Sequence, residues 1–287
     1  MQIFTPDVVI ILGDVFDEGN WVNQKGFDEY VERFKSIFEV PKETRLYAIH
    51  GNHDVSFHQD MHPYLINRFN RAFNTSGVNL IREKKTTKSG KYRVVNFVTV
   101  NSMAMERDGC NLCNEAEFNV KSVAKKLNQL KERDNYSKPI VLQHFPNFRE
   151  NDDNCLDKNS INTEKFRENW ETLSQESTRF ISRTLQPRAF FAGHSHHHCR
   201  VKNSEGVDEF TLASFNWRNI NNPSFVLAIF TPNDFSVSRC DMPKESTVHI
   251  CYAVGCLLST VFAIFSLNMN KLIDKLMSRS KTKKEVE

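Results

Sequence analysis

The main part of this 287-residue sequence has no net charge. Of its 38 Lys and Arg and 35 Asp and Glu residues, six basic and three acidic residues follow residue 267, and residues 248–267 contain none of the four types. This leaves 32 residues of each sign in residues 1–247. A neutral domain offers little electrostatic attraction for phosphate backbones, so the composition argues against a protein that binds nucleic acid.

Residues 248–267, VHICYAVGCLLSTVFAIFSL, lack every strongly charged side chain. A helix of 20 apolar residues is long enough to cross the hydrocarbon core of a bilayer. A buried core helix is the alternative, but such a helix normally keeps a polar stripe. We therefore predict a globular domain at 1–247, a transmembrane helix at 248–267 and a basic tail at 268–287. The positive charge predicts a cytosolic tail and a lumenal domain.

The beginning of the sequence lacks a targeting signal. Residues 1–9, MQIFTPDVV, contain no basic segment and no apolar stretch long enough for a signal peptide or signal anchor. A single C-terminal span without such a signal normally leaves the preceding domain in the cytosol, which conflicts with the charge of the tail. We expect that an N-terminal segment carrying the signal is absent from this sequence.

A second C-x-x-C motif is also lacking. The one copy, CNLC at Cys110 and Cys113, therefore does not indicate a structural zinc site. A short disulfide and a pair of free thiols both remain open.

Hydrophobic periodicity predicts alternating strands and helices. Strands are expected at residues 8–12, 45–50, 92–101, 139–144 and 188–192, followed by several short strands over 201–239. Helices are expected at residues 26–38, 61–73, 115–133 and 168–184, and a polar surface loop at 147–164. The apolar face of the 115–133 helix is predicted to contain Phe118, Val123, Leu127 and Leu130. This order predicts one α/β sandwich with mixed sheets.

Four polar clusters each follow a predicted strand. They are GDVFD at 13–17, GNHD at 51–54, HFP at 144–146 and GHSH at 193–196. Ligands of open α/β sheets bind at the carboxyl ends of strands. Oxygen ligands mixed with imidazole suit Mn, Fe or Zn better than Ca. A single cluster of this kind is usually only a cap or a turn, but four in order favour a metal site.

These clusters resemble the motifs of the calcineurin-like metallophosphoesterase superfamily. The pattern of that family is Asp-x-His, Gly-Asp-x-x-Asp, Gly-Asn-His-Asp/Glu, an isolated His and Gly-His-x-His, and the last four blocks are present. The stretches PDVVIILGDVFDEG and FFAGHSHHHC, with the C-terminal span, look like the branch of membrane-anchored phosphoesterases that remodel GPI anchors.

The resemblance implies a metallophosphoesterase-like αββα sandwich and a phosphodiesterase activity. The enzyme would remove ethanolamine-phosphate from a mannose of the anchor, and the GPI-anchored substrate protein would then leave the ER. The resemblance also implies a membrane location in the ER, at ER exit sites or in the early Golgi.

The resemblance further implies two divalent metal ions, with Mn²⁺ as the expected ion. Asp14 would bridge the two ions. Asn52, His144 and His194 would complete one site, and His196 would bind the other ion.

In the same way, the resemblance implies that His53 is the general acid that protonates the leaving oxygen. Asp17 would orient His53 through a hydrogen bond, and Asp54 is a less favoured candidate for that role.

The Asp-x-His block is the one motif that the sequence lacks. Twelve residues precede Gly13, and none of them is His. The second ion would keep Asp14 and His196, whereas catalytic sites usually supply three protein ligands. An absent N-terminal segment would account for both this block and the targeting signal. Two alternatives remain: an enzyme acting on another phosphate ester, and a non-enzymatic, membrane-tethered chain.

Overall fold

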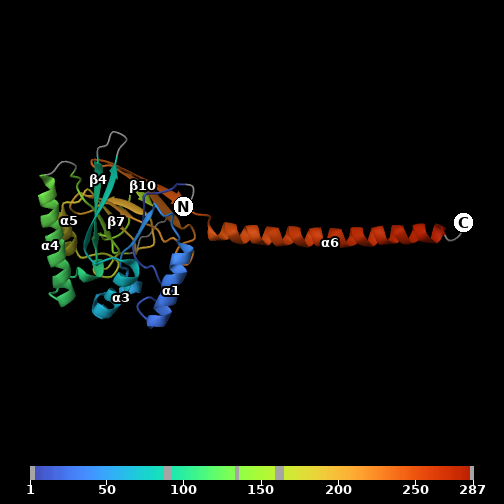
Figure 1. Ribbon diagram of the computed structural model, residues 1–287, viewed down its shortest axis with the longest axis horizontal. Coiled ribbons are helices and arrows are strands. Elements are labelled where there is room, and N and C mark those ends of the chain that lie inside the picture. The colour runs from blue at the N-terminus through green and yellow to red at the C-terminus, as the bar shows by residue number, and fades with distance from the viewer. Residues whose placement is uncertain (1–3, 87–91, 133–135, 159–164, 285–287) are drawn as a thin grey trace.

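The centre of the fold is a seven-stranded mixed sheet with the strand order β3-β4-β5-β7-β9-β8-β6. The computed structural model describes residues 4–86, 92–132, 136–158 and 165–284 (Figure 1). Four strands are parallel neighbours: β4 (Tyr92–Val100), β5 (Ile140–Gln143), β7 (Ala189–Ala192) and β9 (Asp208–Thr211). The antiparallel strands are β3 (Asn79–Thr86), β8 (Cys199–Lys202) and β6 (Asp157–Lys158). The predicted mixed α/β architecture is confirmed.

Two further strand pairs and several helices surround this sheet. The parallel pair is β1 (Val8–Ile11) with β2 (Arg45–Ala48), and the antiparallel pair is β10 (Ser224–Phe230) with β11 (Phe235–Asp241). The helices are α1 (Gln24–Ile37), α2 (Asn52–Val55), α3 (Pro63–Phe73), α4 (Asn111–Lys131), α5 (Gln175–Leu185) and α6 (Glu245–Lys284). Two single-turn 3₁₀ helices are η1 (His58–Asp60) and η2 (Ser102–Ala104).

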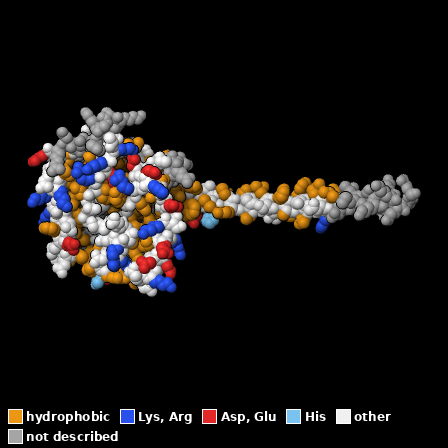
Figure 2. All heavy atoms as spheres, in the orientation of Figure 1, with side chains coloured by type: hydrophobic (Ala, Val, Ile, Leu, Met, Phe, Trp, Pro, Cys, Tyr) orange, Lys and Arg blue, Asp and Glu red, His pale blue; other side chains and the backbone are white. Residues whose placement is uncertain are grey.

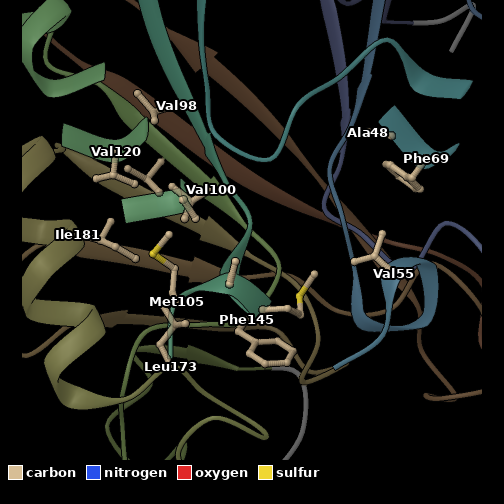
Figure 3. Packing of buried hydrophobic residues seen from close by; sticks show 14 of the residues in the cluster. Ala48, Val55, Phe69, Val98, Val100, Met105, Val120, Phe145, Leu173 and Ile181 are labelled. Carbon is tan, nitrogen blue, oxygen red and sulfur yellow. The ribbon is translucent and has the colours of Figure 1, made fainter. Parts of the chain in front are cut away.

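The central strands are apolar on both faces because both faces are covered. On β7, Ala189 and Phe191 pack in a layer with residues of β1, β10 and β11. Phe190 points to the opposite face and packs with residues of the helices. Figure 3 shows this helix-side core, where Val120 and Ile181 approach the sheet residues Val98 and Val100. The alternation of side chains along a strand explains why continuous apolar runs occur here.

Phe190 offers a direct test of this packing. It is completely buried, so replacement by Ala should leave a cavity and lower the free energy of unfolding by about 3–5 kcal/mol. Urea unfolding of the full chain in detergent would measure the change. Phe118→Ala is the matched control, because Phe118 is 70% exposed and should change stability by less than about 1 kcal/mol. Equal losses in both variants would contradict the assignment.

The buried face of α4 differs from the predicted one. Val123 and Leu127 are buried as expected, but Phe118 is exposed and Leu130 is half-buried. Val120 takes the expected place of Phe118, since residues 120, 123 and 127 form one stripe at helical spacing and Phe118 lies off it. The predicted last residue of this helix, residue 133, lies outside the described residues.

The predicted helix over 168–184 is wrong in its first part. α5 begins at Gln175, and the hydroxyl of Ser174 caps it by accepting the Ser177 backbone N–H at 3.1 Å. Before it, Asn169 has a φ of +61° and donates its N–H to the Thr172 carbonyl at 2.7 Å. A turn with positive φ is incompatible with a right-handed helix.

The predicted surface loop over 147–164 is partly buried. Asn147 and Asp152 are 0% and 2% exposed. The backbone N–H of Asn147 donates to the buried Glu209 at 2.7 Å, and Asp152 accepts from Arg149 at 2.8 Å. These polar partners stabilise a segment that looked solvated by composition alone. Residues 159–164 lie outside the described residues.

α6 leaves the domain as a long isolated helix (Figures 1 and 2). Residues 245–273 are long and apolar enough to cross a membrane, and none of the 18-residue apolar window is buried against the domain. Figure 2 shows hydrophobic side chains along this helix, and the composition of residues 248–267 explains them. The buried core helix that was the alternative does not match this arrangement. The predicted tail extends to residues 285–287, which lie outside the described residues.

Candidate metal centre

The candidate ligands meet because their strands end at the same place. The His144 ring, directly after β5, contacts the chain just beyond β1 through Nδ1 and the Leu12 carbonyl oxygen at 2.7 Å. The Gly193 N–H, after β7, donates to the His144 carbonyl at 3.0 Å. The His53 N–H, in the turn after β2, donates to Oδ1 of Asp14 at 3.0 Å. The prediction that these strand ends converge is therefore confirmed by the geometry.

Three predicted ligands form a compact group. Within the part of the chain that the structure describes, ligand atoms of Asp14, His144 and His194 lie within 4.8 Å of one another. Oδ2 of Asp14 is 3.3 Å from Nε2 of His144, and the ring centroids of His144 and His194 are 5.1 Å apart. Asn52 adds an amide oxygen 3.0 Å from the same Nε2 atom. The group thus combines a carboxylate, an amide and two imidazoles, the side-chain types that the sequence predicts for a metal site.

Hydrogen bonds to backbone carbonyls set the orientation of both imidazoles. Nδ1 of His144 faces the Leu12 carbonyl and Nε2 of His194 faces the Trp170 carbonyl, each at 2.7 Å. Each ring therefore donates one N–H to the backbone and directs its other nitrogen away from that carbonyl. Metal-binding histidines are usually held in this manner. The donor set fits a divalent cation.

The charges of the group also suit a cation. Burial acts to raise the pKa of Asp14, but the neighbouring His144 and His53 lower it far more, so the carboxylate is ionised. Burial and the nearby His144 lower the pKa of His194 to about 3, so its imidazole is neutral. Burial opposes protonation of His144, yet Asp14 raises its pKa, because Nε2 faces two oxygen atoms. Those oxygens require either a proton or a metal ion between them and the nitrogen.

His196 lies outside the compact group. Its carbonyl accepts the Ser214 N–H at 3.1 Å, and its φ is +63°. Burial lowers the pKa of its imidazole, and the charge of Asp14 opposes that effect. His196 is thus a neutral imidazole that experiences the field of Asp14. Its predicted role as a ligand of the other ion stays a prediction.

His53 lies at the rim and its side chain is 46% exposed. Its Nδ1 atom is 2.7 Å from the backbone carbonyl of Asp17 and 3.9 Å from the Asp17 carboxylate. The hydrogen bond predicted between these residues is therefore made by the main chain. The Asp17 carboxylate instead pairs with Arg218.

Asp54 has a structural task and does not act as the residue that orients His53. It is fully buried and accepts the backbone N–H groups of Val15, Phe16 and Gly51 at 3.0–3.2 Å. Burial and the charge of Asp14 raise the pKa of Asp54 to about 8, and the three N–H donors oppose that rise. Asp54 ties the loop after β1 to the loop after β2.

Strained backbone and glycines shape the centre. Asp14, His194 and His196 all have φ between +50° and +65°, a region that is costly for residues with a Cβ atom and that often occurs at functional sites. A Cβ atom at Gly13, whose φ is +88°, would lie 2.5 Å from Nδ1 of His144. These conformations let polar side chains and backbone approach closely.

Gly51→Ala should disrupt the centre. A Cβ atom at Gly51 would collide with the backbone nitrogen and Oδ1 of Asp14 and lie 2.9 Å from its Cα atom. We expect at least about a 100-fold loss of phosphoesterase activity with loss of bound metal, because direct ligands should be at least as sensitive as their outer partners. Metal analysis and a phosphodiester assay would measure this. Gly109→Ala is the matched control, since a Cβ atom there meets nothing within 4 Å, although its positive φ predicts some strain. Wild-type metal content in Gly51→Ala would contradict the prediction.

Three contributors to the centre are absent from the sequence prediction. They are the Trp170 carbonyl, the Arg218 side chain and the buried carboxylate of Asp54 in its tying role. The Asp54 role follows from position, since it is the last residue of the GNHD block. The other two come from loops with no distinguishing pattern.

Comparison with known proteins matches the chain to a family model and to named relatives. The family model described as "Calcineurin-like phosphoesterase" matches residues 2–198. A Drosophila melanogaster protein named "Metallophosphoesterase 1 homolog" is 42% identical over 276 residues, which cover 93% of this chain and 72% of the relative. "Metallophosphoesterase 1" of Gallus gallus is 39% identical over 286 residues, covering 93% of this chain and 70% of the relative.

A solved structure shares the fold. It is a dimetal phosphatase from Danio rerio, with a TM-score of 0.54 and 12% sequence identity, covering 83% of this chain and 84% of that one. The motif residues, their convergence at strand ends and the matching relatives lead to one conclusion. The chain belongs to the calcineurin-like phosphoesterase family.

Proposed function

We propose that this chain is a membrane-anchored, metal-dependent phosphodiesterase that removes ethanolamine-phosphate from a mannose of GPI anchors. The observation that carries the hydrolytic part is the convergence of Asp14, Asn52, His144 and His194 beside the exposed His53. The substrate follows from the resemblance of the motif stretches and the C-terminal span to the GPI-remodelling branch.

The protein residues have separable tasks in this proposal. Two bound divalent ions, with Mn²⁺ as the expected species, would supply a nucleophile from water and neutralise phosphate charge. Asp14, Asn52, His144 and His194 would hold the first ion, and Asp14 and His196 the second. The Asp17 carbonyl accepts the Nδ1–H of His53, which leaves Nε2 to carry the transferable proton. His53 would protonate the departing alcohol oxygen.

A single loop connects this rim to the candidate membrane helix. In the segment 214–221, the Ser214 N–H donates to the His196 carbonyl, and Arg218 pairs with Asp17. The same segment also contacts the start of α6. The Trp217 indole donates to the Pro243 carbonyl at 2.9 Å, and the Asn221 carbonyl accepts the Glu245 N–H at 3.1 Å. This connection keeps the rim within one short loop of the start of α6. It supports a substrate that is itself attached to the membrane.

The proposal also includes a topology. The six basic residues that follow residue 267 predict a cytosolic C-terminus, so the domain would lie in the lumen of the ER or early Golgi. Protease protection in sealed microsomes tests this. A domain tag that is digested without detergent would contradict the lumenal placement.

The substrate is tested with the full chain in detergent or liposomes supplied with Mn²⁺. We expect release of ethanolamine-phosphate from an isolated GPI glycan, measured by mass spectrometry. Nucleotide and phospholipid diesters and a phosphate monoester form the comparison arms, and Asn52→Ala is the inactive control. Preferred turnover of another ester would reject the GPI substrate while keeping the enzyme class. One bound ion or none per chain, without turnover of any ester, would favour the non-enzymatic alternative.

A further inference from the structure

A second cluster of reactive side chains lies outside the metal centre. Among the described residues, potential ligand atoms of His58, Asp108, Cys110 and Cys113 lie within 4.8 Å of one another. Cys110 and Cys113 form a disulfide, which resolves the alternatives left open by the sequence. Hydrolysis of a phosphate ester gives this cluster no task.

The two sulfur atoms have different environments. Cys110 is the N-cap of α4 and is partly exposed, whereas Cys113 is completely buried. The backbone N–H of Cys113 points at Sγ of Cys110 at 3.0 Å. A backbone N–H and the positive end of a helix dipole both stabilise a thiolate. Cys110 is therefore the accessible sulfur and the better thiolate of the pair.

His58 lies beside the buried sulfur. Its Nδ1 atom is 3.6 Å from Sγ of Cys113 and 3.3 Å from the Met103 carbonyl oxygen. Its Nε2 atom is 2.9 Å from Oδ2 of Asp108 and 3.6 Å from Glu106. Both ring nitrogens therefore face hydrogen-bond acceptors, and Nδ1 is the nitrogen that also faces Sγ of Cys113.

We propose that Cys110–Cys113 is a thiol–disulfide exchange site for a dithiol partner, with His58 transferring a proton to and from Cys113. A thiolate of the dithiol attacks Sγ of Cys110, the Cys110–Cys113 bond breaks, and the electron pair goes to Cys113. Cys113 takes the Nδ1 proton of His58. The mixed disulfide joins the first sulfur of the partner to Cys110. The second thiolate of the partner then attacks that first sulfur, which closes the partner's disulfide and releases Cys110 as a thiolate.

In this sequence two electrons pass from the dithiol to the protein, and the dithiol becomes a disulfide. Asp108 is a positioning residue for His58. Its Oδ1 atom also accepts the Cys110 N–H at 3.0 Å. An Asp108→Asn change keeps an amide oxygen for that N–H but removes the negative charge beside Nε2.

The disulfide Cys155–Cys199 serves as an internal comparison. It joins residues 44 apart, and its sulfur atoms lie among a different set of groups that includes Asp152. The loop closed by Cys110–Cys113 contains two residues. Because a short loop restricts the unfolded chain little, the Cys110–Cys113 bridge can open with less effect on folding than the longer one.

The test uses the full chain in detergent with dithiothreitol as the dithiol, followed by alkylation and peptide mass analysis over time. Cys110–Cys113 should be reduced at least about 10-fold faster than Cys155–Cys199, since thiolate stability and access govern exchange. His58→Gln should slow the reduction of Cys110–Cys113 by about 100-fold, the lower range for a general acid. His62→Gln is the matched control and should leave the rate unchanged, because His62 is exposed at the start of α3, where its Nδ1 atom accepts the Tyr64 N–H at 3.1 Å.

Two further variants separate proton transfer from structural damage. Asp108→Asn should slow exchange while Asp108→Glu restores much of the rate, with unchanged thermal unfolding in both. Cys113→Ser should retain one glutathione on Cys110 after treatment with oxidised glutathione, whereas Cys110→Ser should not retain it on buried Cys113. Equal reduction rates for the two disulfides, or a wild-type rate in His58→Gln, would overturn the proposal.

Discussion

Replacing His53 by Gln is expected to lower kcat for alkyl phosphate diesters by roughly 10²–10⁴-fold, the usual contribution of a general acid. His53 contributes its ring at the rim of the centre, where the Asp17 carbonyl fixes Nδ1. Gln lacks a group that can donate a proton to an alkoxide. Because the compact group of ligands is made by other side chains, the bound metal should stay at the wild-type level.

The dependence on the leaving group makes this prediction specific. A nitrophenyl diester releases a stable anion that needs little protonation, so His53→Gln should reduce its hydrolysis much less than that of an alkyl diester. Steady-state kinetics with both esters, together with metal analysis, measures the difference. His62→Gln is the control. Equal losses on both esters would indicate a general disturbance of the site and would contradict the role of a general acid.

Much of the centre was predictable because strand direction and motif position are linked. β1 and β2 are parallel, as are β4, β5, β7 and β9, so polar residues that follow β1, β2, β5 and β7 collect at one edge. The glycines in the motifs were readable for the same reason. They mark places where His144 and Asp14 leave no room for a Cβ atom.

The supporting contacts were not predictable from local pattern. The Trp170 carbonyl that orients His194 belongs to a loop over which the sequence predicts a helix, since helical spacing does not reveal the positive φ of Asn169. Arg218 reaches Asp17 from 201 residues away. Cys155 and Cys199 likewise pair through the association of β6 with β8, which neither segment indicates by itself.

The burial of individual side chains was also set by tertiary contacts. The sequence predicts burial of Phe118, but α5 and the sheet pack against the stripe that contains Val120 and Val123, and Phe118 lies off that stripe. Polar segments show the reverse effect. Asn147 is buried because Glu209, on a distant strand, accepts its backbone N–H.

Asp14→Asn should cause the most severe loss of function. Its carboxylate is the ionised group of the centre, and it contacts His144 at 3.3 Å and the His53 N–H at 3.0 Å. An amide keeps the shape but removes the charge that attracts a cation. Loss of an outer partner of a metal ligand typically costs 10–100-fold, so loss of this carboxylate should cost more than roughly 100-fold in activity and in metal affinity.

A control at the opposite end of β1 isolates the effect of position. Asp7 precedes β1, is exposed and pairs with Lys85, whereas Asp14 follows the other end of that strand. Asp7→Asn removes the same charge from the chain and should retain metal and turnover. Elemental analysis and phosphodiester kinetics on both variants test the comparison. Because the carboxylate acts by attracting cations into a buried group, raising the Mn²⁺ concentration should partly restore Asp14→Asn. Full metal content with normal turnover at low Mn²⁺ would show that Asp14 does not anchor the site.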